Sequence, residues 1–131
     1  MADKIQFDLV SPERLLLSQP VDMVTIPGSE GYMGVMAGHM ALVSTLRAGM
    51  IDIKENGVDT RFFIRGGFAE INATQVTVLA EEAIPMTELD LAVLDQRIKD
   101  AQEDEIAAKT DAERQKAANL VDDLKLVRAA F

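Results

Sequence analysis

The sequence predicts an α+β chain, in which an antiparallel β-sandwich or flattened barrel of about eight to ten strands is followed by an antiparallel two-helix hairpin. Up to about Pro85, apolar and polar residues alternate with a period of two, and glycines interrupt these runs at short intervals. This pattern is typical of short, half-buried strands. Beyond Met86 there is neither glycine nor proline, and apolar residues recur at helical spacing. We therefore expect a β-sandwich domain at residues 1–86 and a helical hairpin at 87–131.

The length, cysteine content and net charge of the chain exclude several classes of function. The chain has 131 residues, enough for one compact domain and a modest appendage. No apolar run approaches the ~20 residues that span a bilayer, and nothing at the start has the pattern of a signal peptide. Cysteine is absent, which excludes disulfides, thiolate metal sites and a cysteine nucleophile. The net charge of −9 argues against nucleic acid as a partner and against unaided binding to an anionic membrane.

The strands are expected in a regular order along the first domain. The first, residues 4–10, places Ile5, Phe7 and Leu9 on one side of the chain. A turn follows at Ser11-Pro12-Glu13, because proline suits the second position of a turn. The further expected strands are 15–18, 21–26, 41–47, 51–55, 58–64, 68–72 and 75–80. Strands this short and this closely spaced are typical of a sandwich or barrel.

Asn56-Gly57 is the strongest local signal, since the tightest hairpin turn needs positive φ at both central residues. If these two residues form the turn, the register is fixed. Two opposite-charge pairs, Lys54 with Asp59 and Asp52 with Arg61, then share one face. The other face carries Ile51, Ile53, Phe62 and Ile64. A one-residue slip would break both pairs, so the register is well specified.

The helical domain has two start signals, Thr87-x-x-Asp90 and Thr110-x-x-Glu113, which resemble capping boxes. Two helices of about 20 residues are expected, joined by a polar link near 108–110. Each carries a narrow apolar stripe spaced 3, 4 and 3. The stripes consist of Leu91, Leu94, Ile98 and Ala101, and of Ala117, Leu120, Leu124 and Val127.

The segment from Pro27 to Met50 holds five of the eight glycines and the single histidine. It lacks a lysine and the G-x-x-x-x-G-K-[ST] pattern, so tight turns explain its glycines better than a phosphate loop does. His39 has no second metal ligand in the same turn, and a structural or interface role is favoured over catalysis. The neighbouring carboxylates Glu81 and Glu82 point to opposite faces of a strand, which favours solvated charge. No catalytic residue, metal site or cofactor is predicted.

Several segments, taken together, resemble one family. They are FDLVSPE from Phe7, GSEGxxGVMAGHxxLVxxLRxGMI from Gly28, GGFAEI from Gly66 and VTVLAEEA from Val76. The chain resembles the ε subunit of bacterial F-type ATP synthases, whose mitochondrial equivalent is the δ subunit. The resemblance covers essentially the whole chain and includes the order of sandwich and helical hairpin.

The resemblance implies a non-catalytic subunit of the central stalk, peripheral on the cytoplasmic face of the bacterial plasma (inner) membrane as part of F1. It would couple proton flow through the c-ring to ATP synthesis through the γ subunit, without membrane insertion of its own. The residues implied to contact γ are Ser11, Gly38, His39 and Met40. The residues implied to contact the c-ring are Glu30, Gly31, Tyr32 and Met33. Some members have an acidic residue where Tyr32 stands, so the charged contact falls to Glu30 or becomes aromatic.

The helical hairpin of many members extends toward the α and β subunits and blocks ATP hydrolysis, and some members bind ATP there. Their [IL]-D-x-x-R-A motif is degenerate here, since Asp90 is present but Val93 replaces the arginine and Asp100 replaces a second one. Phosphate binding needs those cations, so we expect weak or no nucleotide binding. Two alternatives stay open, a generic sandwich-and-hairpin adaptor of another complex and a small enzyme that uses His39.

Overall fold

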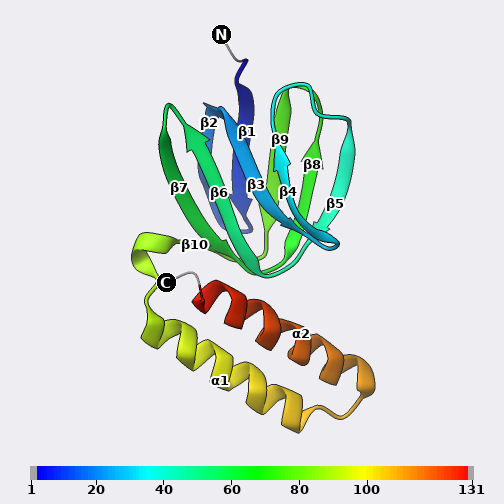
Figure 1. Cartoon of the computed structure of the whole chain (residues 1–131). Coiled ribbons are helices and arrows are strands. Elements are labelled where there is room, and N and C mark those ends of the chain that lie inside the picture. Colours follow the sequence, from blue (N-terminus) through cyan, green and yellow to red (C-terminus); the bar gives the residue numbers. More distant parts are fainter. Residues whose placement is uncertain (1–2, 130–131) are drawn as a thin grey trace. The chain divides into compact units, whose positions relative to one another are not determined.

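The computed structural model describes residues 3–129. The chain divides into two compact units, one ending at Pro85 and the other beginning at Met86 (Figure 1). The first is a β-sandwich of ten strands and the second contains two helices, so the expected fold class is confirmed. No helix in the described part of the chain is long and apolar enough to cross a membrane.

The ten strands form one continuous sheet that folds into two facing layers (Figure 1). Their order is β10-β7-β6-β3-β5-β8-β9-β1-β2, and β4 pairs with β3 off this path. The strands are β1 (Ile5–Ser11), β2 (Arg14–Val21), β3 (Met23–Gly28), β4 (Gly31–Val35), β5 (Leu42–Leu46), β6 (Gly49–Glu55), β7 (Val58–Ile64), β8 (Gly67–Ile71), β9 (Gln75–Ala80) and β10 (Ala83–Pro85).

Three features of the sheet differ from the expectation. First, β1 and β9 pair in parallel, whereas a fully antiparallel sandwich was expected. Second, residues 31–35 form strand β4 within the stretch that was expected to be a turn region. Third, the short β10 was not foreseen. The reason is the same in each case: strand pairing between distant segments supplies the hydrogen bonds, and alternation within a segment does not reveal its partner.

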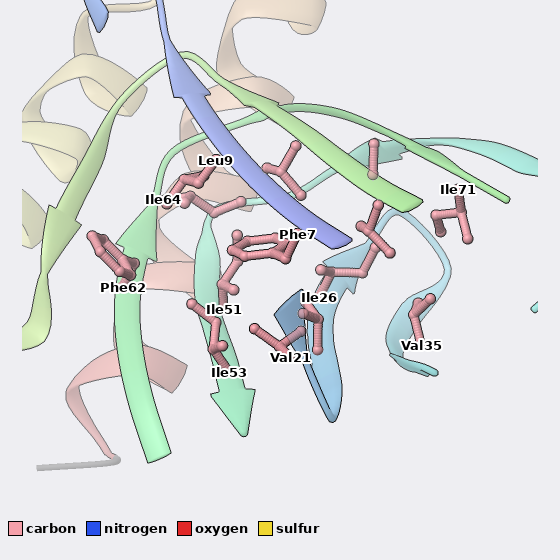
Figure 2. Close-up of a cluster of buried hydrophobic side chains, with 14 of the residues drawn as sticks. Phe7, Leu9, Val21, Ile26, Val35, Ile51, Ile53, Phe62, Ile64 and Ile71 are labelled. Carbon is pink, nitrogen blue, oxygen red and sulfur yellow. The ribbon is translucent and has the colours of Figure 1, made fainter. Parts of the chain in front are cut away.

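The core lies between the two layers and follows the predicted alternation. Ile5, Phe7 and Leu9 of β1 are fully buried, as are Val76 and Val78 of β9. Figure 2 shows the cluster, in which Phe7 lies among aliphatic side chains from β3, β6 and β7. Each such side chain contributes about 1.5–3 kcal/mol when it is fully buried, so this cluster holds the sandwich together.

The β6–β7 hairpin confirms the expected register at every position, from Glu55 opposite Val58 to Ile51 opposite Phe62. Asn56 and Gly57 have φ of 51° and 79°, as the two-residue turn requires. On the outer face, Arg61 Nε lies 3.5 Å from Asp52 Oδ2. A local turn signal and the charge pattern therefore fixed this register correctly.

The helices are α1 (Leu91–Ala107) and α2 (Asp111–Arg128), preceded by the short 3-10 helix η1 (Met86–Glu88). The first start signal was placed too early, because Asp90 and not Thr87 caps α1 by accepting from the N–H of Val93. The second is confirmed, since Thr110 caps α2 by accepting from the N–H of Glu113. The carboxylate of Glu113 accepts in turn from the N–H of Lys109.

The apolar stripes differ from the expectation at one position in each helix. Leu94, Ile98 and Ala101 of α1 are buried, but Leu91 is 42% exposed because it is the first helical residue. In α2 the buried stripe uses Val121 in place of Leu120. The helical period of 3.6 residues rotates the buried face gradually, and a strict 3, 4, 3 spacing does not follow that rotation.

Candidate functional site

The outer face of strands β8, β9, β1 and β2 carries an apolar row. Phe68, Leu79, Val10 and Leu15 lie directly opposite one another in register across these four strands. Directly opposite side chains share a face of a sheet and touch. Phe68 and Leu15 are 40% and 57% exposed, and the other two are half-buried. We call these four residues the apolar band.

A shallow groove of about 430 Å³ runs along the band and ends at the turn between β1 and β2. Its lining includes Val10, Phe68 and Leu79, together with Ser11 and other turn residues. The groove depends on Gly67, where a Cβ would lie 2.0 Å from the carbonyl oxygen of Leu79. Only glycine lets β8 approach β9 so closely at this point.

A second apolar area surrounds the loop between β4 and β5. It consists of Met36, Met40, Leu42 and Val43, with exposures of 54%, 82%, 42% and 68%. We call these four residues the methionine corner. The loop is held by Gly38, which has φ of +89° and donates its N–H to the carbonyl of Ala73 at 2.8 Å.

The methionine corner and the apolar band share a face along β5. Val43 and Thr45 point to the same face of that strand because they are two residues apart. Thr45 lies directly opposite Phe68, the first member of the band. Val43 itself lies opposite Glu70, so Thr45 and Glu70 separate the methionine corner from the apolar band on this face. Exposed apolar patches of this kind mark protein interaction sites.

His39 lies within the methionine corner and is tied to its own loop. Its Nδ1 is 2.7 Å from the carbonyl oxygen of Met40, a distance at which the ring N–H donates to the carbonyl. Its backbone N–H donates to the carbonyl of Met36 at 3.2 Å. Among residues 3–129, no group of three or more His, Cys, Asp or Glu side chains could hold a metal ion.

The β3–β4 hairpin forms a third surface at its tip, residues 29–33. Glu30 and Gly31 are exposed, and Gly31 has φ of +135°. Tyr32 is 54% exposed, yet its hydroxyl accepts a hydrogen bond from the N–H of Met50 at 3.2 Å. The tip is anchored to β5, because the N–H of Ser29 donates to the carbonyl of Thr45. We call these five residues the hairpin tip.

A polar cluster occupies the part of the outer face beyond the band. The carboxylate of Asp8 accepts from Ser18 Oγ at 2.6 Å, from Gln6 Nε2 at 3.1 Å and from Gln75 Nε2 at 3.0 Å. The hydrogen bonds from Ser18 and Gln6 are the main cause that lowers the pKa of Asp8 below its ordinary value. The outer face thus has an apolar part beside the β1–β2 turn and a polar, ionised part nearer the start of β1.

Comparison with known proteins identifies the family. The family described as the β-sandwich domain of the ATP synthase delta/epsilon chain matches residues 4–86. The chain belongs to the ATP synthase delta/epsilon family. The ATP synthase epsilon chain of Parvibaculum lavamentivorans is 53% identical, over 98% of this chain and 98% of its own length. That of Maricaulis maris is 50% identical, over 92% of this chain and 91% of its own length.

Solved structures of the family agree with the fold. A chain of the Euglena gracilis mitochondrial ATP synthase, solved with OSCP, F1 and the c-ring, matches with a TM-score of 0.82 and 28% identity. The match covers 99% of this chain and 82% of that chain. A chain from the central stalk and c-ring of the Tetrahymena thermophila enzyme has a TM-score of 0.76 at 18% identity and supports the fold alone.

The residues expected at the two family interfaces are distributed over both ends of the sandwich. One row of paired residues runs from Gly31 through Gly28, Leu46 and Gly67 to Ala80. Leu79, next to Ala80, pairs with Val10. The hairpin tip and Ser11 therefore lie at the same end.

Gly38, His39 and Met40 lie at the other end, beside the turn after β8. The residues expected to contact γ thus span the length of the outer face, and Ser11 shares its end with those expected to contact the c-ring.

The two residues of the degenerate ATP motif have structural surroundings in the helical unit. Asp90 Oδ1 accepts from the N–H of Val93 at 2.8 Å and so caps α1. Val93 is 38% exposed. The carboxylate at the start of the family motif therefore already accepts a hydrogen bond from the first turn of α1.

Sequence reasoning missed the apolar band and, in the methionine corner, Met36, Leu42 and Val43. The sequence does contain a signal for the band, because Val10 and Leu79 are apolar residues at outward positions of strands that otherwise alternate regularly. An outward apolar residue in one strand has little meaning by itself. Only the pairing of β8, β9, β1 and β2 puts four of them in a row.

Proposed function

We propose that this chain is a non-catalytic subunit of the ATP synthase central stalk, which couples proton flow through the c-ring to ATP synthesis through the γ subunit. Family membership supports the assignment to the enzyme. The observation that carries the role in the stalk is the presence of two exposed apolar areas, the methionine corner and the apolar band. A chain of net charge −9 that exposes two such areas is suited to stable protein contact.

The γ subunit is the proposed partner of that face. Ser11 borders the groove beside the apolar band, Met40 belongs to the methionine corner, and His39 is bonded to the carbonyl of Met40. An elongated partner that lies along the sheet would cover both areas at once, which a compact ligand could not do. The groove beside Phe68 would take an apolar side chain of γ near the centre of the contact.

The hairpin tip is the proposed contact with the polar loops of the c-ring. It projects from the sandwich on a two-stranded hairpin and exposes Glu30 and Tyr32. The chain would thereby be peripheral to the membrane, on its cytoplasmic face as part of F1. The helical unit is the proposed regulatory part, able to contact the α and β subunits and to inhibit ATP hydrolysis.

Co-purification tests the central-stalk assignment. An affinity-tagged chain, expressed in a bacterium in place of the host's own counterpart, should bring down the γ subunit and the c-ring. Phe68→Asp should reduce the recovery of γ by at least tenfold, because it places a charge in the apolar band beside the groove. Val58→Asp is the matched control, since Val58 is 63% exposed but lies at the β6–β7 turn, outside the band.

The same experiment separates the alternatives. Recovery of an unrelated complex without γ would favour a generic adaptor and contradict the proposal. Equal recovery of γ with Phe68→Asp and with Val58→Asp would show that the band is not the γ surface. An activity that disappears with His39→Ala while γ recovery is unchanged would favour the enzyme reading.

A further inference from the structure

The N–H of Met50 lacks a partner in the β-ladder of the sandwich. In the β6–β7 hairpin the pair that flanks the two-residue turn, Glu55 with Val58, is a hydrogen-bonded pair, and such pairs alternate along the ladder. Met50, five residues before Glu55, therefore falls in a non-hydrogen-bonded pair with Phe63, and its N–H points toward β3. Continuing the β3–β6 register beyond Thr25 opposite Asp52 would bring Pro27 opposite Met50.

The Pro27 carbonyl, which this register would offer to that N–H, accepts instead from the N–H of Arg47 at 2.9 Å. The hydroxyl of Tyr32 takes the vacant place, at 3.2 Å from the nitrogen of Met50. A side chain from β4 thus supplies the acceptor for an N–H of β6 that the paired residues of β3 do not reach.

Pro27 and Gly49 surround the position of the Tyr32 hydroxyl. Pro27 lies directly opposite Tyr32 in the β3–β4 pairing, so both side chains leave the same face. A Cβ at Gly49 would lie 2.7 Å from the Tyr32 oxygen and 2.9 Å from Cβ of Pro27. Glycine at position 49 therefore leaves room for both side chains. The phenol is held at its oxygen while 54% of the residue stays exposed.

A phenol that accepts through its oxygen still has one O–H proton to donate. Because the oxygen is fixed on the Met50 N–H, this donor is held in position beside an exposed, uncharged ring. Glu30 is two residues away and exposed, and its charge disfavours a carboxylate at the same place. The acceptor that fits best is therefore a neutral one, a backbone carbonyl or a side-chain amide.

We propose that Tyr32 is a specificity-determining residue of the hairpin tip, which donates its hydroxyl proton to a neutral acceptor in the partner loop. This inference rests on the proposed function, in which that loop belongs to the c-ring. A donor contact of this kind does not depend on ionic strength, unlike a carboxylate at the same position. The tip would then recognise a polar, uncharged loop surface at position 32 and would use charge only through Glu30.

The test uses ATP synthase assembled without this chain and titrated with the purified full-length chain. The readout is the chain concentration that restores half-maximal ATP-driven proton pumping, at low and at high KCl. Tyr32→Phe should raise this concentration about 3- to 10-fold, because it removes one hydrogen bond to the partner. The ratio of variant to wild type should be the same at both salt concentrations.

A second measurement separates donation to the partner from the bond to Met50. Tyr32 is the single tyrosine of the chain, so biosynthetic 3-fluorotyrosine labels this position alone. Fluorination makes a phenol a stronger donor and a weaker acceptor. We expect the labelled chain to restore pumping at a lower concentration than the unlabelled chain, while the Tm of the isolated chain falls slightly. Val58→Thr, at an exposed site on the β6–β7 turn, is the control and should change neither quantity.

Three outcomes would overturn the inference. Equal half-maximal concentrations for Tyr32→Phe and wild type would remove Tyr32 from the contact. A fluorotyrosine effect in the same direction as that of Tyr32→Phe would leave only the structural bond to Met50. A variant-to-wild-type ratio that shrinks at high KCl would mean a charged acceptor. If the wild-type chain itself fails to restore pumping, the proposed function fails as well, and this result is distinguishable from the other three.

Discussion

The carboxylate of Asp22 accepts a hydrogen bond from the backbone N–H of Asn56, with 2.7 Å between Oδ2 and the nitrogen. Asn56 is the first residue of the β6–β7 turn, and Asp22 lies between β2 and β3. Lys4 Nζ joins both, at 3.0 Å from Asp22 Oδ1 and 2.9 Å from Asn56 Oδ1. Three segments far apart in the sequence are thus held together at one end of the sandwich by a single set of polar contacts.

Because of this arrangement, the stability of the sandwich should decrease at acid pH. The hydrogen bond from Asn56 and then the contact with Lys4 lower the pKa of Asp22 below its ordinary value of 3.8. Since the folded-state pKa is depressed, the stabilisation is complete above about pH 3.8 and is lost as the pH falls through the folded-state pKa. The Tm should therefore be nearly constant from pH 7 to about pH 5 and should fall below about pH 4.

Asp22→Asn keeps the acceptor for the N–H of Asn56 but removes the charge. We expect a lower Tm than wild type at neutral pH and a shallower decrease below pH 4. Differential scanning calorimetry across this range measures both. Parallel acid curves for the two proteins would contradict the role of Asp22. Asp8 and Asp95 also have lowered pKa values, from hydrogen bonds of Ser18 and Arg128 respectively, so part of the acid dependence should remain in the variant.

Three glycine-to-alanine substitutions in the sandwich should form a graded series. Gly34→Ala should change the free energy of unfolding by less than about 0.5 kcal/mol, because its Cβ would meet Met23 Sδ at an ordinary 3.6 Å. Gly57→Ala should cost about 1–2 kcal/mol, since its φ is +79° although space is open. Gly67→Ala should cost at least about 3 kcal/mol, because its Cβ would lie 2.0 Å from the backbone of Leu79. Urea denaturation measures the series, and a different order would contradict it.

Truncation of the buried stripe of α2 should destabilise the helical unit. Leu124 is 2% exposed, so Leu124→Ala should reduce the free energy of unfolding of this unit by about 2–5 kcal/mol. Leu126→Ala, at a residue 66% exposed, is the control and should change it by less than about 0.5 kcal/mol. Thermal loss of helical circular dichroism is the measurement. Equal effects of the two substitutions would mean that the stripe does not hold the hairpin together.

Nucleotide binding by the helical unit should be weak or absent. Val93 and Asp100 stand where phosphate-binding arginines are expected, and the Asp90 carboxylate caps α1. Isothermal titration of the isolated chain with ATP should give no Kd tighter than about 1 mM, an affinity that needs only about 4 kcal/mol. Asp90→Ala should instead destabilise α1 by about 1 kcal/mol through loss of the cap. A tighter Kd that disappears with Asp90→Ala would contradict this assignment.

Local signals predicted much of the fold. The Asn56-Gly57 turn fixed the β6–β7 register, because its backbone requirement is met within two residues. Alternation identified Phe7, Leu9, Val76 and Val78 as core. The start of α1 was placed three residues early, since both Thr87 and Asp90 are good capping residues and the sequence does not decide between them. The apolar stripe of α2 was read one residue away from the buried face, at Leu120 in place of Val121, because a heptad spacing only approximates the helical period. In α1, Leu91 is exposed because the helix begins there.

The candidate surfaces were only partly predictable. His39, Met40 and the hairpin tip stood out because they lie in one unusual glycine-rich segment. Phe68, Leu79, Val10 and Leu15 are distributed over 70 residues of sequence and become neighbours only through strand pairing. The same holds for Tyr32, whose bond to Met50 depends on where the β3–β6 pairing ends.

By itself, the sequence determined the two-part α+β architecture, the β6–β7 register, the second helix cap and the resemblance to the family. Each of these depends on residues close together in the chain, or on a pattern that repeats along it. The tertiary structure decided the parallel pairing of β1 with β9, the apolar band, the separation of Ser11 from His39 and the anchoring of Tyr32. These depend on which distant segments pair, and that choice follows from the free energy of packing the whole sandwich rather than from the preference of any one segment.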